Sequence, residues 1–461
     1  MTTPLDLYLT DEHEALRRRV REFAEAEIAP VARELDESST FPWDNVAKMA
    51  ELGLLGVNVP RELGGLGLDY ASYILVIEEV ARVDASHAIT ISAHSTLGTS
   101  PILVFGSEWQ KQRYVPLLAR GRVLGGFGLT EPSAGSDAGG TATVATRADG
   151  GYQLNGSKIF ITHAGVGEVF VVTAATDKSK GTKGITSFIV TKETSDRAEA
   201  ERVGVGHAPE LEPFTGGVKA AKKEDKTGWR ASDTRELVLE NAFVAEENRL
   251  GAEGEGFVNF MKTLDSGRIG IGALALGLAQ GAFEQAVAFT SGREQFGKPL
   301  RDFQGVSFPL AEMATEIAAA RHLVYHAAWL KQRDRPFRTE AAMAKLYASE
   351  LAMRATTKAI QLMGGYGYTS DYPVERMFRD AKICEIGEGT SEVQKLVISR
   401  DLFREFDALA PTSASGIRRQ ASETADGRDG KNSGSADSEA GRLAPDAQGG
   451  APESSRTPAN V

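Results

Sequence analysis

The feature that most constrains the fold of this chain is a hydrophobic period that changes twice along the sequence. In the first part, apolar residues recur at helical spacing, as at Leu16, Val20 and Phe23. In the middle part, short β-branched runs such as Val169–Thr173 alternate with turn dipeptides such as Asn155–Gly156. In the last part, the helical period returns over stretches of about twenty residues. We therefore predict a fold of the α+β class.

The same pattern predicts where the parts of the chain begin and end. Long amphipathic helices with short connections favour a four-helix bundle. The predicted parts are an N-terminal helical domain (1–122), a central small β-barrel or sandwich domain (123–250), a C-terminal four-helix bundle (251–406) and a tail (407–461). Residues 193–226 are charged and Gly-rich, so we predict an extended surface insertion there. The tail is poor in large apolar residues and is predicted to be disordered, with no assignable function.

The bulk composition excludes several classes of function. A net charge of -11 without a basic tract argues against nucleic acid or an anionic membrane as the main partner. The single cysteine, Cys384, excludes an intramolecular disulfide and a multi-cysteine metal site, and it fits a reducing cytoplasm. No secretory signal is visible near the start, and the apolar stretch Ile269–Ala279 is too short to span a bilayer. We expect a cytoplasmic protein without metal or membrane association.

One acidic residue lies in an unusual setting near the end of the predicted bundle. Glu388 lies between two glycines, where the backbone can approach a ligand closely and the side chain can swing. Thr390 and Ser391 are typical helix N-caps, and Ser391 with Gln394 matches the capping box. A helix N-terminus beside this carboxylate offers free N–H groups to an anion or a developing oxyanion. On these residues alone, an ordinary turn with a solvated glutamate remains an alternative.

Two segments of the predicted β domain are further candidates for binding. Residues 125–137, GGFGLTEPSAGSD, offer backbone N–H groups that can bond a planar heterocycle or a phosphate, or they simply connect two domains. Residues 157–164, SKIFITHA, place Phe160 beside Thr162 on an apolar strand. This pair suits the edge of a flavin, although such a pair is more often part of a sheet core.

Three features of the predicted bundle carry charge or exposed backbone. Arg293, in the segment SGREQFGKPLRDFQ (291–304), is placed for bidentate pairing with a pyrophosphate or for a solvent salt bridge. Asp265 and Arg268 are spaced as a routine helix pair that can also face a ligand. The segment QLMGGYGY (361–368) contains a Gly-Gly turn whose backbone is open to a nucleotide.

These motifs together resemble the acyl-CoA dehydrogenase family, especially its short-chain, butyryl-like members. The resemblance rests on TEPSAGSD, the F-I-T strand, SGREQFGKPLRDFQ, QLMGGYGY and DAKICEIGEGTSEVQ, in this order over about residues 5 to 405. It implies the three-domain fold predicted above, and non-covalent FAD between the β domain and the bundle. It also implies an acyl-CoA substrate, electron-transfer flavoprotein as redox partner, a homotetramer and a role in fatty acid β-oxidation.

The resemblance also implies roles for individual residues. Glu388 matches the catalytic base, and Gln361, Gly364 and Gly365 match contacts made across a subunit interface. The residues that match flavin contacts are Phe127, Leu129, Thr130, Ser136, Phe160, Ile161, Thr162, Arg293, Phe296, Gln304, Gln361, Gly364, Gly365, Thr390 and Glu392. The residues that match substrate contacts are Ser136, Asp265, Arg268 and Gly389.

The implied reaction is the α,β-dehydrogenation of a saturated acyl-CoA to the trans-2-enoyl-CoA. Glu388 would remove the weakly acidic α-proton while its own backbone N–H and a flavin hydroxyl bind the thioester oxygen, and the β-hydride would pass to flavin N5. An acyl chain closed over this carboxyl is expected to raise its pKa from about 4.3 to about 6–7. Two alternatives are an acyl-CoA oxidase that uses dioxygen and a catalytically silent flavin-binding interaction module.

Several residues depart from the family pattern. Gly387 replaces a common Tyr, Phe160 replaces Trp and His163 replaces Asn, which bears on the width of the pocket. Some relatives supply the base from the residue before the Arg that matches Arg268, but here that residue is Gly267. Residues 84–100 contain neither Arg nor Lys, and an uncompensated buried carboxylate is costly, so we expect an uncharged acyl chain.

Overall fold

The N-terminal part is helical, as predicted. The computed structural model describes residues 8–409. Its first helices are α1 (Asp11–Phe23), α2 (Ala32–Ser38), α3 (Trp43–Glu51), α4 (Tyr70–Ala81), α5 (Ala85–Ser92), α6 (Ser100–Phe105) and α7 (Glu108–Ala119). Pro30 follows a π-helical turn and separates α1 from α2, since proline cannot continue the helical hydrogen bonding. Asp69 caps α4 by accepting from Ser72 N, and Ser107 with Gln110 forms a capping box at α7.

Two helical stretches of the described residues are long and apolar enough to cross a membrane by length and composition, Ala85–Phe105 and Gly256–Gly292. The most apolar window of each is 72% buried inside the fold, so other elements of the same chain cover these side chains. Core helices of globular proteins have the same composition.

The central part forms one eight-stranded sheet whose hydrogen-bonded path does not close into a barrel. Its strands are β1 (Gly125–Gly128), β2 (Val144–Ala148), β3 (Gly151–Thr162), β4 (Val169–Ala175), β5 (Ile185–Thr191), β6 (Val218–Lys223), β7 (Thr234–Ala245) and β8 (Arg249–Leu250). The order is β6-β7-β3-β2-β4-β5-β8, and β1 pairs in parallel with β4. Most of the other pairs are antiparallel, as the turn-punctuated strands predict.

The prediction that residues 193–226 form an extended surface insertion is wrong. This segment contains α8 (Arg197–Val203) and strand β6, which pairs with β7 at the edge of the sheet. Ala200, Val205 and Leu211 are buried against the rest of the fold. The buried apolar residues of the segment are Ala200, Val205, Ala208, Leu211 and Val218, and they are too sparse among many charges to be recognised in the sequence.

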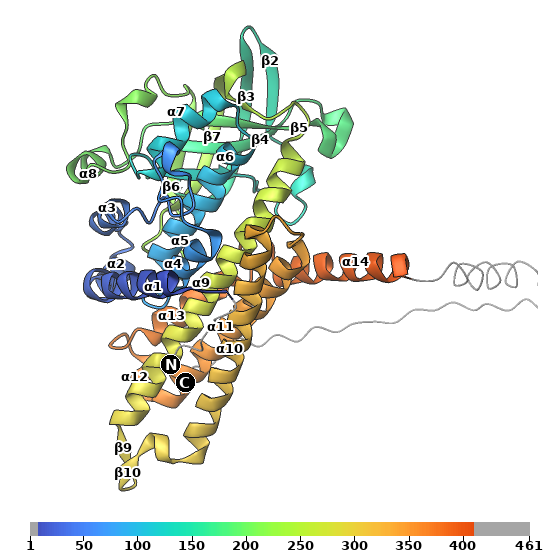
Figure 1. The fold of residues 1–461 in the computed structure, drawn as a ribbon. Helices are drawn as coiled ribbons and strands as arrows, with labels where there is room; N and C mark the ends of the chain where they lie inside the picture. The colour runs from blue at the N-terminus through green and yellow to red at the C-terminus, as the bar shows by residue number, and fades with distance from the viewer. Residues whose placement is uncertain (1–7, 410–461) are drawn as a thin grey trace, which may run out of the picture. The chain divides into compact units, whose positions relative to one another are not determined.

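The C-terminal part is built on α9 (Gly256–Gly292), the longest helix of the described residues. The other helices are α10 (Gln304–Gln332), α11 (Arg338–Met363), the short α12 (Gly365–Tyr368), α13 (Val374–Cys384) and α14 (Ser391–Leu409). Figure 1 shows α9 running from the sheet at one end to the β9–β10 hairpin (Glu294–Pro299) at the other. A side chain at Gly277 would collide with the backbone of α4, so glycine permits this close helix contact. The predicted tail (407–461) lies outside the described residues, except that residues 407–409 belong to α14.

A buried charge network ties α4, α9 and α10 together. Arg321 donates to Glu78 Oε1 at 2.9 Å and to Gln280 Oε1 at 2.9 Å, and Tyr325 donates to Glu78 Oε2 at 2.7 Å. All four side chains are buried, so each charge depends on its partners in place of water.

The substitution Arg321→Met is therefore expected to destabilise the protein by about 3–5 kcal/mol, because it leaves Glu78 charged and unpaired in the core. Thermal unfolding followed by circular dichroism measures the effect. Arg33→Met removes a pair between two exposed side chains, Arg33 and Glu37, and should cost less than about 1 kcal/mol. Equal losses for the two variants would contradict this account.

Candidate functional site

The carboxyl group of Glu388 is the most unusual polar group of the fold. It lies in the turn between α13 and α14, and its backbone has a positive φ of 54°. Both carboxylate oxygens are buried, and neither has a hydrogen-bond partner among residues 8–409. Burial raises the pKa of Glu388 to about 7, although the charges of Lys345 and Arg268 act in the opposite direction. The fold alone therefore raises the pKa of Glu388 into the range that we expected from the sequence only after an acyl chain had closed over the carboxyl group.

The carboxyl group rests on α9, at a position where the helix has no side chain. A Cβ added to Gly267 would overlap the carboxylate oxygens of Glu388 and lie 2.8 Å from Cδ. Glycine at 267 therefore makes room for Glu388. Because glycine has no side chain, this position also cannot supply the alternative base that some relatives carry there.

The start of α14 differs from the prediction in one detail. Thr390, and not Ser391, caps the helix, because Thr390 Oγ1 accepts from Val393 N at 3.3 Å. The predicted capping box of Ser391 with Gln394 is absent, and Gln394 Nε2 donates instead to the Gly389 carbonyl at 2.8 Å. Glu392 is exposed beside this turn. Two adjacent hydroxyl residues made the position of the cap ambiguous in the sequence.

The predicted substrate residues of α9 lie beside Glu388. Arg268 is buried and donates to Asp265 Oδ1 at 2.6 Å, so the predicted helix pair is formed. Arg268 directly follows Gly267, on which the Glu388 carboxyl rests, and its charge lowers the pKa of Glu388. Gly389 follows Glu388 with a φ of 97°, a conformation that glycine adopts at little cost.

The β-domain candidates lie together at one edge of the sheet. A bulge in β3 between Lys158 and Ile161 turns Phe160 outward with a φ of 59°, and its side chain is 63% exposed. Ile159 N donates to Thr130 O at 2.8 Å, so Thr130 lies beside the part of β3 that carries Phe160, and Thr162 follows in the same strand.

An ion pair and the packing of two side chains also define this edge. A buried ion pair of 2.5 Å between Lys158 and Glu131 anchors the turn that carries Thr130. The side chains of Phe127 and Ile161 pack in hydrophobic cores, so neither side chain is available to a ligand. Leu129 is half-buried and Ser136 is exposed.

The fold brings this sheet edge and Glu388 onto the same helix. Phe127 stacks on Phe260 of α9 with ring centroids 3.9 Å apart, and Glu388 lies on Gly267, about 10 Å further along the helix. One side of this site offers an exposed aromatic ring and two hydroxyls, and the other side offers an unpartnered carboxyl group. This arrangement suits a flat heterocycle with a thin apolar substrate beside it. FAD fits this arrangement, with Thr130, Phe160 and Thr162 as the residues of this chain that would hold its ring.

The remaining flavin candidates are not brought to this place within one chain. They are Arg293, Phe296, Gln304, Gln361, Gly364 and Gly365, and all are exposed. Arg293 lies at the far end of α9, about 38 Å from Arg268 along the helix (Figure 1). Its guanidinium lies over the ring of Tyr366 in α12, 5.5 Å from the centroid, which joins it to the Gly-Gly turn.

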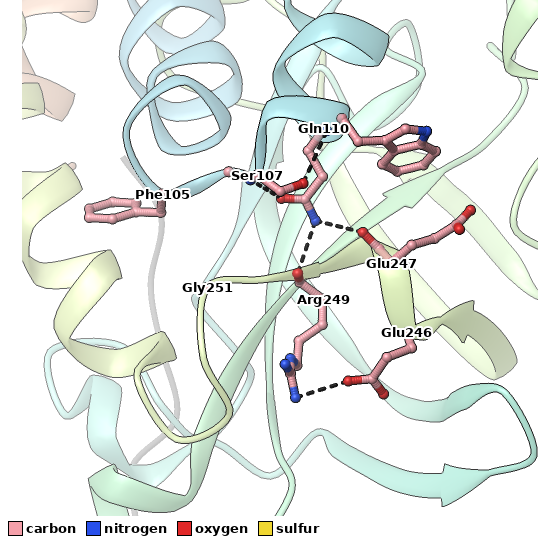
Figure 2. Close-up of a pocket in the computed structure, with 9 residues that line it drawn as sticks. Phe105, Ser107, Gln110, Glu246, Glu247, Arg249 and Gly251 are labelled. Carbon is pink, nitrogen blue, oxygen red and sulfur yellow. Dashed lines mark hydrogen bonds and ion pairs between the residues drawn. The ribbon is translucent and has the colours of Figure 1, made fainter.

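A separate cavity of about 490 Å³ lies between the α6–α7 turn and the segment that joins β7 to α9. Figure 2 shows the Gln110 amide bridging the carbonyls of Glu247 and Arg249, at 2.8 and 2.9 Å, and Arg249 paired with Glu246. None of the predicted site residues lines this cavity, so we assign it no catalytic role. Among residues 8–409, no group of three His, Cys, Asp or Glu side chains is placed to hold a metal ion.

Lys345 was not predicted as a site residue. Its buried ammonium donates to the Gly389 carbonyl at 2.8 Å. A signal was present: Lys345 lies at helical spacing from Ala341, Ala348 and Ala352, which form the buried stripe of α11. A lysine on an otherwise apolar stripe indicates either a buried partner or a site.

The comparisons with known proteins agree with this geometry. Family models match three consecutive parts of the chain: "Acyl-CoA dehydrogenase, N-terminal domain" at residues 10–122, "middle domain" at 126–242 and "C-terminal domain" at 254–403. The short-chain specific acyl-CoA dehydrogenase of Clostridium acetobutylicum is 50% identical over 400 residues, 87% of this chain and 100% of that protein.

Two solved structures are similar over most of the chain. A chain in the structure of the electron transferring flavoprotein of Acidaminococcus fermentans is 46% identical with a TM-score of 0.81, covering 88% of this chain and 100% of that one. An acyl-CoA dehydrogenase of Bacillus anthracis complexed with FAD is 32% identical with a TM-score of 0.78, covering 89% of this chain and 71% of that one.

The contact between Glu388 and α9 predicts the effect of a single methyl group. In Gly267→Ala, the new Cβ occupies the place of the carboxylate, so Glu388 should turn away by more than about 1 Å, while the helix itself is stabilised by alanine. A crystal structure of the variant measures this displacement. Gly292→Ala, on the same helix with nothing within 4 Å of its Cβ, should leave Glu388 in place. An undisturbed Glu388 in Gly267→Ala would refute the contact.

Proposed function

The chain belongs to the acyl-CoA dehydrogenase family, and we propose that it catalyses the FAD-dependent α,β-dehydrogenation of a short, uncharged acyl-CoA thioester. The observation that carries the proposal is the buried, unpartnered carboxyl group of Glu388 with a pKa of about 7. A base with a pKa near the working pH is well matched to a weakly acidic α-proton.

In the proposed reaction, the Glu388 carboxylate takes the α-proton of the thioester. The Glu388 N–H makes no hydrogen bond among the described residues, so it is available to stabilise the negative charge that develops on the thioester oxygen. The β-hydrogen leaves with its electron pair as a hydride while the double bond forms. Bound FAD supplies the two-electron acceptor for this hydride.

Three observations support the short, uncharged acyl chain. The relative from C. acetobutylicum is specific for short chains. One turn beyond Gly267, a Cβ on Gly270 would meet Ser92 Oγ at 2.8 Å and Tyr73 OH at 3.3 Å, so α4, α5 and α9 are closely packed there and leave little room for a long chain. Residues 84–100 contain no Arg or Lys to pair with a charged tail.

The FAD site is completed, in this proposal, by a second copy of the chain. Arg293, Phe296, Gln304 and the turn at Gly364–Gly365 lie too far along α9 to meet the flavin ring of their own copy. Their exposure at the far end of the bundle fits a contact with the cofactor of a neighbouring subunit, as expected of a homotetramer. The buried single cysteine fits the reducing cytoplasm as the place of work.

The substitution Glu388→Gln tests the base directly. The variant should bind FAD and butyryl-CoA, because the amide keeps the shape of the carboxyl group, but anaerobic bleaching of the flavin should slow by about 10³-fold or more. Stopped-flow absorbance measures the rate. The parent enzyme should be bleached faster by butyryl-CoA than by hexadecanoyl-CoA. Parent-like bleaching of Glu388→Gln would remove this residue from the mechanism.

Electron-transfer flavoprotein is the proposed redox partner, because a similar chain occurs in the structure of such a flavoprotein. The parent should turn over butyryl-CoA with electron-transfer flavoprotein as acceptor, and it should form little hydrogen peroxide in air without it. Peroxide formation at the rate of substrate consumption would instead identify an oxidase.

A further inference from the structure

The turn that carries Glu388 is held in a strained conformation by two buried side chains. Glu388 and Gly389 have φ values of 54° and 97°. A glutamate rarely adopts such a φ unless its surroundings enforce it. The Gly389 carbonyl accepts from Lys345 Nζ and from Gln394 Nε2, both at 2.8 Å. Both side chains are fully buried and come from two different helices, α11 and α14.

We propose that Lys345 and Gln394 clamp the Gly389 carbonyl and so position Glu388 over α9, and that the charge of Lys345 keeps the Glu388 carboxylate ionised for proton removal. This proposal rests on the proposed function of Glu388 as the base. Lys345 and Gln394 are positioning residues, since they act on the substrate only through Glu388.

Among the groups around Lys345, Glu388 is the carboxylate that its positive charge stabilises. Lys345 Nζ bonds the carbonyl of Gly389, the residue after Glu388, and its charge interacts with Cys384, Glu385, Glu388 and Arg268. Burial raises the pKa of Cys384 to about 12, so the thiol is neutral, and Glu385 is paired with Lys382 at 2.6 Å. Lys345 makes no ion pair of its own among residues 8–409, and its single hydrogen bond goes to the neutral Gly389 carbonyl.

The groups that face Glu388 from the other elements support the same conclusion. Tyr70 and Tyr73 of α4 are neutral, because burial raises the pKa of each. Arg268 of α9 is already paired with Asp265 at 2.6 Å. Among residues 8–409, Lys345 of α11 is therefore the cation near the base that has no ion pair, and its charge lowers the pKa of Glu388 more than that of Arg268 does.

Two substitutions separate the charge from the hydrogen bonds. Lys345→Met removes both, so kcat for butyryl-CoA should fall about 10- to 100-fold, and the acid limb of the pH profile of kcat should move up by about 1 pH unit. The limb moves up because loss of a positive charge disfavours the ionised carboxylate. Gln394→Met removes hydrogen bonds to the Glu388 and Gly389 carbonyls but no charge, so kcat should fall while the acid limb stays in place.

Lys192→Met is the matched control. Lys192 is equally buried and bonds three backbone carbonyls in the β domain, so its loss should leave the acid limb unchanged. If Lys345→Met loses FAD, Lys345→Gln keeps a polar group in the buried position and must show the same shift of the limb.

Each outcome bears on one claim. A parent enzyme that is not bleached by any acyl-CoA would defeat the proposed function itself. If the parent enzyme is bleached but Lys345→Met, or Lys345→Gln in its place, has the kcat and the acid limb of the parent, the proposed role of Lys345 is overturned. Unchanged kcat in Gln394→Met would overturn the clamp.

Discussion

The interaction on which the site depends is the contact between the Glu388 carboxyl group and the bare backbone of α9 at Gly267. It removes a titratable group from water without giving it a hydrogen-bond partner among the described residues. Desolvation disfavours the charged form, and this cost is the physical origin of a carboxyl group that titrates near neutral pH. The rest of the bundle supports this one placement: α9 supplies the platform, α11 the nearby cation, and α14 the bond that fixes the turn.

The arrangement also explains why the central helix is rich in small residues. At Gly277 the backbone of α4 approaches α9, and at Gly267 a functional group from another element does so. Glycine therefore permits close packing in the middle of the helix and a close approach of Glu388 nearer the sheet. A buried network around Glu78 and Arg321 holds α4 and α10 against this helix at Gln280.

Much of this site could be predicted from the sequence, for reasons that are local. The period changes identify the helical and β parts, and an acid between two glycines before a hydroxyl pair stands out as a mobile carboxylate at a helix start. The sequence could not show which residues of different helices come together in space. The role of Lys345 depends on which face of α11 meets the α13–α14 turn, and the cap of α14 depends on which of two adjacent hydroxyls meets a free backbone N–H. Residues 193–226 were misjudged because their buried side chains are separated by many exposed charges.

The central claim is that the fold, before any substrate binds, holds Glu388 desolvated with its pKa near neutrality. Infrared difference spectroscopy tests it most directly, by following the carbonyl band of the protonated carboxyl group against pH in the parent enzyme minus Glu388→Gln. The account predicts a band that disappears with a midpoint near pH 7. A midpoint near the usual glutamate value of about 4.3 would contradict it, because the carboxylate would then be solvated and the contact with Gly267 would not exist in solution.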